Sequence, residues 1–249
     1  MKQLNKVASI TLLFWLMKVV ATTLGETLGD FISMTLNYGY VIGIAITLVV
    51  FIIALLIQIS AKEYKPVKYW LVIIGTTTLG TEISDFVDRS LHLGYLWGSI
   101  LLAACLTGTL MVWYNKYKTL EVYPISERNK ELLFWLAVLF SNSLGTAFGD
   151  FLSDNLEMSY VHGAMMTGVI ILIVVLLHYF TKLNHILLFW IAFVFTRPFG
   201  ATFGDFLTKP REKGGLALGT LNASLVSIFL MAIMIAIVHK RTATNRLDR

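Results

Sequence analysis

The sequence predicts an all-α membrane protein with eight transmembrane helices, built as four tandem, parallel two-helix repeats. Three observations predict this class. Hydrophobic residues make up 57% of the chain and charged residues only 14%, whereas soluble domains carry about 25% charged residues. Several apolar segments reach the length of about 20 residues that crosses a bilayer. One motif also recurs four times, and such repetition determines an architecture before any other signal.

The repeated motif places two small residues and an aspartate inside an apolar segment. Its copies are Leu24-Gly-Glu-Thr-Leu-Gly-Asp30-Phe31, Leu79-Gly-Thr-Glu-Ile-Ser-Asp85-Phe86, Leu144-Gly-Thr-Ala-Phe-Gly-Asp150-Phe151 and Phe199-Gly-Ala-Thr-Phe-Gly-Asp205-Phe206. The aspartates are 55, 65 and 55 residues apart. We therefore expect one membrane domain, 1–249, with repeats 1–62, 63–120, 121–182 and 183–249 and pseudo-halves 1–125 and 126–249.

Each repeat is expected to contain two membrane helices, the first carrying the motif and the second plainly apolar. The first helices are predicted at roughly 7–31, 67–87, 131–152 and 186–207, and the second at roughly 40–60, 95–114, 161–180 and 216–238. Residues that break helices, such as Asn37-Tyr38-Gly39, separate the two. Two-helix units keep the same orientation along the chain, so the repeats are parallel rather than inverted.

Basic residues predict the orientation. Fourteen lysines and arginines lie in the termini and in the loops near 61–68, 116–130 and 181–185, whereas four follow the motifs: Arg89, Lys209, Arg211 and Lys213. The positive-inside rule then predicts that both termini are cytoplasmic. These residues flank apolar spans and do not alternate with aromatic residues, so nucleic acid is not expected as a partner.

The small residues and tryptophans of the repeats have a structural interpretation. Small residues four apart let helix backbones approach closely, and four such pairs predict that the motif helices pack together: Gly25/Gly29, Gly80/Ser84, Gly145/Gly149 and Gly200/Gly204. A tryptophan precedes each aspartate by 15 residues, at Trp15, Trp70, Trp135 and Trp190. Because these lie just after basic clusters, we expect them to anchor the helices at the lipid interface.

The charged residues inside the helices carry the functional prediction, because ionisable groups in a membrane are costly and usually functional. Packing of the motif helices would gather the four aspartates, Asp30, Asp85, Asp150 and Asp205, around one cavity that binds an ion, including a divalent metal. Glu26 and Glu82 share helix faces with their aspartates and are expected to carry protons there. Lys18 and Arg197 are expected to pair with carboxylates. In the alternative interpretation, the aspartates cap the turn or face headgroup water.

The Trp…Leu-Gly-x-x-x-Gly-Asp-Phe pattern, present four times with two helices each, resembles a family of bacterial integral membrane proteins known for a fourfold repeat of unknown function. The resemblance covers essentially the whole chain and rests on the four tryptophans and the four motifs. It implies a bacterial inner-membrane location and a two-helix repeat, and it supplies no activity. The second copy departs with Ser84 in place of glycine, and the fourth departs with Pro198-Phe199 before its first glycine.

These observations favour a secondary transporter of a small cation, either a divalent metal or protons exchanged for one. A second interpretation is a non-transporting scaffold or sensor whose motif serves helix packing. A third is an anion or organic-solute carrier that uses Lys18 and Arg197. No arrangement of serine, cysteine or histidine suggests nucleophilic catalysis, so neither an enzyme nor a cofactor is expected. The expected partners are the lipid bilayer and the cation, and a homo-oligomer is left open.

Overall fold

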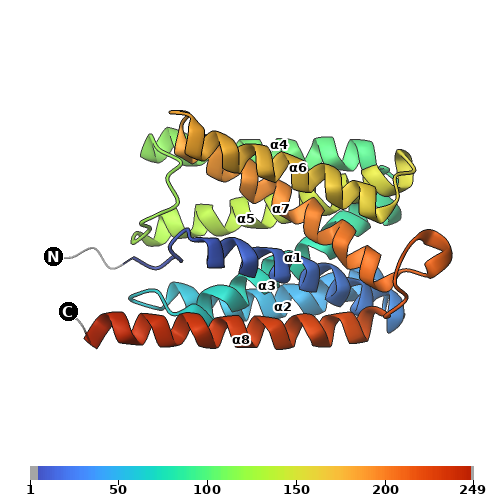
Figure 1. Ribbon diagram of the computed structural model, residues 1–249, viewed down its shortest axis with the longest axis horizontal. Coiled ribbons are helices and arrows are strands. Elements are labelled where there is room, and N and C mark those ends of the chain that lie inside the picture. Colours follow the sequence, from blue (N-terminus) through green and yellow to red (C-terminus); the bar gives the residue numbers. More distant parts are fainter. Residues whose placement is uncertain (1–4, 248–249) are drawn as a thin grey trace.

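The described part of the chain is all helical, with eight long α-helices, short π or 3-10 turns after the motifs, and no strand (Figure 1). The computed structural model describes residues 5–247, and side chains from residue 5 to residue 241. Lys2 and Arg249, two of the basic residues counted above, lie outside it, as does the side chain of Arg246. The helices are α1 (Leu12–Asp30), α2 (Gly39–Ile59), α3 (Pro66–Asp85), α4 (Tyr95–Tyr117), α5 (Arg128–Asp150), α6 (Tyr160–Phe180), α7 (His185–Thr208) and α8 (Thr220–Leu247).

Local signals fix where the helices begin. The side chain of Thr11 accepts a hydrogen bond from the amide of Phe14, so α1 begins later than the sequence predicts. Pro66 occupies the first turn of α3, where its missing amide hydrogen costs nothing. The turns after the motifs contain a left-handed residue followed, two positions later in three repeats, by a glycine with positive φ: Asn37/Gly39, His92/Gly94 and Ala217/Gly219. Glycine adopts this conformation without strain.

The four motif helices form a closed ring. Helix α1 packs against α3, α3 against α5, α5 against α7, and α7 back against α1. The second helices surround this ring, and each packs against the motif helix of the next repeat: α2 on α3, α4 on α5, α6 on α7 and α8 on α1 (Figure 1). Because α8 contacts α1, the ring is closed within one chain.

Seven of the described helices are long and apolar enough to cross a membrane, as in a multi-pass membrane protein. The exception is α3. It contains the run Thr76-Thr77-Thr78 and the buried pair Glu82 and Asp85, which reduce its apolar character. It lies in the ring and contacts α1, α2 and α5, so protein rather than lipid covers most of it.

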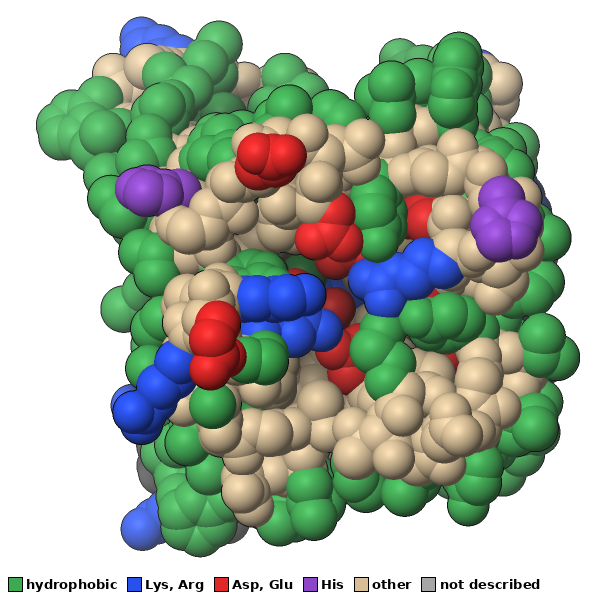
Figure 2. Space-filling view, turned by 90° about the vertical axis from the view of Figure 1, so that its right-hand side faces the viewer, with side chains coloured by type: hydrophobic (Ala, Val, Ile, Leu, Met, Phe, Trp, Pro, Cys, Tyr) green, Lys and Arg blue, Asp and Glu red, His purple; other side chains and the backbone are tan. Residues whose placement is uncertain are grey.

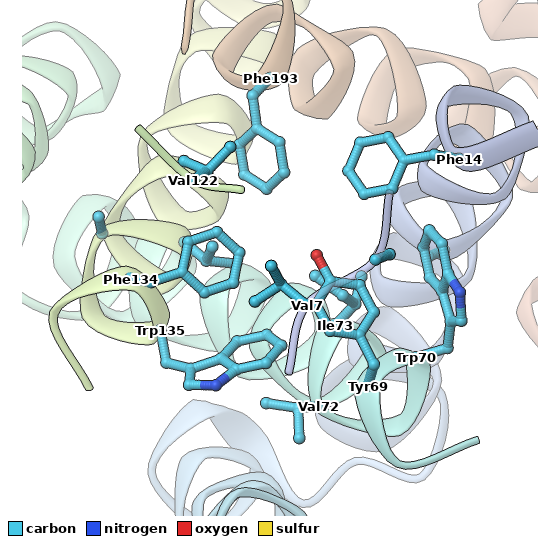
Figure 3. Packing of buried hydrophobic residues seen from close by; sticks show 14 of the residues in the cluster. Val7, Phe14, Tyr69, Trp70, Val72, Ile73, Val122, Phe134, Trp135 and Phe193 are labelled. Carbon is cyan, nitrogen blue, oxygen red and sulfur yellow. The ribbon is translucent and has the colours of Figure 1, made fainter. Parts of the chain in front are cut away.

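Aromatic residues near the beginning of the motif helices fill the core at one end of the ring (Figure 3). Trp70 lies 5.7 Å from Phe14, and Trp135 lies 5.3 Å from Tyr69, between ring centroids. Trp70 and Trp135 are each only 1% exposed. This aromatic layer closes the ring at this end, because it brings together side chains from α1, α3, α5 and α7.

The prediction that the tryptophans anchor the helices against lipid is therefore wrong for Trp70, Trp135 and Trp190, which are buried inside the bundle. Trp15 is half-buried and packs 5.7 Å from Phe189. The reason is helical geometry. Fifteen residues at about 100° each bring a tryptophan to within roughly 60° of its aspartate around the helix. A helix that turns its aspartate toward the interior therefore turns its tryptophan inward as well.

Candidate functional site

The four motif aspartates come together at the end of the ring opposite the aromatic layer. Each is buried, with at most 5% of its surface exposed, so they do not face headgroup water as the alternative interpretation would have it. A cavity of about 220 Å³ opens at this end beside Asp150 and Asp205, and its lining is Glu26, Met34, Arg89, Asp150, Asp154, Tyr160, Asp205, Lys209 and Lys213. Figure 2 shows acidic and basic side chains gathered around a depression in the middle of this face.

Two basic residues join the aspartates in pairs. The ammonium nitrogen of Lys209 lies 2.9 Å from a carboxylate oxygen of Asp30 and 3.1 Å from one of Asp205. Arg89 lies 3.2 Å from Asp150 and 3.8 Å from Asp85. Each base therefore joins its own repeat to a neighbouring one.

Sequence reasoning missed both bases, which it treated only as topology signals. The missed signal is spacing, because Arg89 and Lys209 each follow their own aspartate by four residues, and residues four apart share a helix face. The equivalent positions in the first and third repeats hold Met34 and Asp154. The fourfold repeat of sequence thus becomes a twofold pattern of charge.

The two bases are not held equally. Arg89 also donates hydrogen bonds to the hydroxyl groups of Tyr40 and Tyr95, at 3.0 and 3.1 Å. The ammonium group of Lys209 contacts Asp30 and Asp205. The two side chains are about equally exposed, 27% for Lys209 and 30% for Arg89. Burial lowers the pKa of Lys209, but attraction to Asp205 and Asp30 outweighs this and holds the pKa above its ordinary value. Lys209 is therefore a charged lysine held by carboxylates, whereas two tyrosines also fix Arg89 in place.

Below the aspartates lies a buried ion pair. Arg197, expected to pair with a carboxylate, pairs with Glu26 at 2.9 Å and donates a second hydrogen bond to the Thr22 carbonyl at 3.3 Å. Glu26, Asp30 and Asp205 each place a carboxylate oxygen within 4.8 Å of the other two. Three carboxylate oxygens this close form a set that suits a hard divalent cation.

The structure does not bring Lys18 to a carboxylate, so its predicted charge pairing is wrong. Lys18 donates a hydrogen bond to the side chain of Asn142 at 2.8 Å and lies 4.2 Å from the ring centre of Phe193. It is eight residues from Glu26, or about 12 Å along the helix, which exceeds what the lysine side chain spans. The Asn142 amide in turn donates to the Thr76 hydroxyl at 3.0 Å.

Glu82 also departs from its predicted place. It is not among the residues that line the cavity. Its carboxyl group lies against Gly43 of α2. A Cβ added to this glycine would be 2.5 Å from one carboxylate oxygen of Glu82. Glu82 therefore points from α3 toward the outer helix α2.

The small residues of the motifs lie at the contacts between motif helices. A Cβ added to any of these glycines would meet the next helix of the ring: Gly25 and Gly29 meet Thr77 and Thr81, Gly80 meets Asn142 and Ser143, Gly145 and Gly149 meet Arg197 and Ala201, and Gly200 and Gly204 meet Thr22 and Glu26. Ser84 is buried as well, and its hydroxyl donates to Asp88 at 3.2 Å. The strip of small residues thus brings the four helices close enough to gather their carboxyl groups.

Comparison with known proteins agrees with the repeat seen in the structure. The chain matches the family described as Repeat of Unknown Function (DUF347) four times, over residues 13–64, 68–119, 133–184 and 188–244. Each match begins two residues before a motif tryptophan. No curated protein and no solved structure matches the chain. The expected resemblance to a fourfold repeat family is confirmed, and the chain belongs to the DUF347 family of repeats of unknown function.

Proposed function

We propose that this protein is a secondary transporter of a small cation in the bacterial inner membrane, with both termini cytoplasmic. In this proposal α3 is the eighth membrane-crossing helix, flanked by α1 and α5 and covered by α2, and the four two-helix repeats run parallel. The observation that carries the proposal is an imbalance of charge. Five buried carboxyl groups from all four motif helices share three basic partners, Lys209, Arg89 and Arg197. Such a cluster favours the entry of positive charge.

The cation site lies on the Lys209 side of the cavity. The three carboxylates whose oxygens approach within 4.8 Å, Glu26, Asp30 and Asp205, include both partners of Lys209. Of the two basic partners of the aspartates, Lys209 lacks the tyrosine contacts that hold Arg89. An entering cation therefore displaces its ammonium group, which neutralises the site when no substrate is bound. A divalent cation that binds three carboxylates is the substrate class that this set favours.

Movement across the membrane requires the opposite end of the ring to open. There the aromatic layer lies in the path, and a buried ion pair lies beyond it. The Lys6 ammonium contacts Glu131 at 3.0 Å, and the amide of Gln58 donates to Glu131 at 3.1 Å. These contacts join the segment before α1 to the end of α2 and the start of α5. In this proposal, the cavity beside the aspartates is the open side of the transporter, and the contacts of Glu131 belong to the closed side.

Replacing Lys209 by methionine is expected to tighten cation binding by about tenfold, because the tethered competitor is removed while the carboxylates remain. The affinity is measured by titrating the purified protein with divalent and monovalent cations and recording the thermal unfolding midpoint at each concentration. Lys213→Met is the matched control, since it removes a positive charge from the same cavity lining and leaves the Lys209 pairs intact. Weaker binding by Lys209→Met would show that the lysine belongs to the site rather than competing for it.

The direct test of function is flux. Wild-type protein is reconstituted in liposomes and exposed to a panel of divalent cations, monovalent cations and pH gradients, beside liposomes that contain the fourfold Asp→Asn variant at equal abundance. Uptake of one cation class by the wild type alone supports the proposal. A flat response of the wild type across the whole panel overturns it. Gel filtration of both proteins shows whether the variant is folded.

The scaffold interpretation keeps one specific observation in its favour. Every motif aspartate has a basic partner, and the motif glycines all lie at helix contacts. A protein whose motif serves only packing would use these features in the same way. It predicts that the fourfold Asp→Asn variant folds and behaves as the wild type does, so the same experiment distinguishes the two.

A further inference from the structure

One buried acid has no part in the cation site described above. Glu82 is fully buried, and neither oxygen of its carboxyl group has a hydrogen-bond partner among the described residues. The equivalent positions of the other repeats, three residues before each aspartate, hold Thr27, Ala147 and Thr202. The packing of the repeat therefore requires only a small side chain here, and the carboxyl group of Glu82 is an addition specific to the second repeat.

Among the described residues, no basic side chain forms an ion pair or a hydrogen bond with Glu82. Asp30 and Glu26 of α1 and Asp85 of α3 itself are acidic, and Asp30 and Glu26 are close enough to repel a charge on Glu82. Helix α2 contains no charged residue, and its one titratable side chain is Tyr40 in its first turn. Helix α5 carries Asp150 at the same end, and α8 has no titratable residue before His239. Arg197 is engaged by Glu26 and Thr81. Arg89, which follows Glu82 by seven residues, is engaged by Asp85, Asp150 and Tyr40.

A carboxyl group in such a place is stable only in its neutral form. An ionised carboxylate that is buried without a counter-charge or a hydrogen bond is strongly unfavourable. The neutral acid carries no net charge and fits in the space that Gly43 leaves open on α2. Loss of the proton makes this position unfavourable, so the side chain must turn toward the cavity or α2 must move away from α3.

We propose that Glu82 is a proton-binding site, separate from the central cavity, that carries the proton which drives cation movement. This inference rests on the proposed transport function and names its driving ion. One proton binds to a carboxylate oxygen of Glu82 and is later released to water, with no other bond formed or broken. The contact between α2 and α3 is then the element that senses this change, because Glu82 lies between them.

The first test is chemical and needs no transport. N,N′-dicyclohexylcarbodiimide partitions into apolar regions, and a neutral carboxylic acid adds across one of its C=N bonds to give a stable acylurea that keeps all atoms of both reagents. Mass spectrometry of the reconstituted protein is expected to find this label on Glu82 more than on any motif aspartate. Labelling is expected to fall as the pH rises from about 5 to about 9. An unlabelled Glu82 throughout that range would overturn the proposal, whether or not the protein transports a cation.

The second test separates proton coupling from cation transport. Glu82→Gln keeps the shape of the side chain, and Glu82→Thr introduces the residue that two other repeats use at this position. Both variants are expected to lose cation uptake driven by a pH gradient by about tenfold or more, and to retain exchange of labelled for unlabelled cation at equal pH. Uptake by both variants at the wild-type rate would overturn the role of Glu82 and leave the transport function intact. Absence of both activities from the wild type itself would instead contradict the transport function.

Discussion

Asp205→Asn is expected to weaken cation binding by roughly 100-fold, whereas Asp85→Asn is expected to weaken it by less than about tenfold. Asp205 belongs to the three-carboxylate set with Glu26 and Asp30. Loss of one charged ligand from a buried site costs roughly 2–3 kcal/mol, which corresponds to about two orders of magnitude in affinity. Asp85 lies on the other side, 3.8 Å from the clamped Arg89.

Equilibrium titration of the purified variants with the cation identified in the flux panel measures the difference. The two substitutions are chemically identical and alter equivalent positions in two repeats, so each is the control for the other. Gel filtration and the unfolding midpoint show whether either variant has lost its fold. Equal losses of affinity in two folded variants would place the cation between all four aspartates rather than on the Lys209 side.

Gly200→Leu is expected to prevent normal closure of the ring and to lower the free energy of unfolding by about 3 kcal/mol or more. A Cβ on Gly200 would collide with the side chain of Thr22 and would lie 3.0 Å from the backbone nitrogen of Thr23, so α1 and α7 would have to separate. A backbone cannot yield as a flexible side chain does. The unfolding midpoint in detergent and the fraction of monodisperse protein measure the loss.

Gly108→Leu is the matched control for this change. Gly108 lies on the outer helix α4, is exposed, and has open space where a Cβ would be. Leucine has a higher helix propensity than glycine, so this variant should be at least as stable as the wild type. A stable, monodisperse Gly200→Leu protein would contradict the close approach of α1 and α7.

The part of the fold that depends on short-range pattern could be predicted from the sequence. The alternation of motif helix and apolar helix follows from the repeat, and the gathering of Asp30, Asp85, Asp150 and Asp205 follows from the small residues beside them. The position of Trp70 inside the bundle also follows from helical geometry, once the inward face is known. The basic residues that precede the tryptophan in the sequence instead favoured a position at the lipid interface.

Other features depend on contacts that no local pattern encodes. Lys209 reaches Asp30 across the junction between the last and the first repeat, so its role becomes visible only when the ring is closed. Lys18 and Arg197 are similar buried bases, yet one meets an amide and the other a carboxylate because different helices face them. The direction of Glu82 is likewise set by which outer helix covers α3.

The offset packing of the outer helices bears on how such a chain can originate. Helix α4 ends the first half and covers α5, which begins the second half, while α8 ends the second half and covers α1. The contact between the last helix of one half and the first helix of the other therefore occurs twice, head to tail. Two such contacts are enough to close the ring. A chain of half this length carries both sides of that contact, so two copies would close the same ring as a homodimer. The basic residues follow the same period, because Arg89 and Lys209 alternate with Met34 and Asp154 at the equivalent positions of the four repeats.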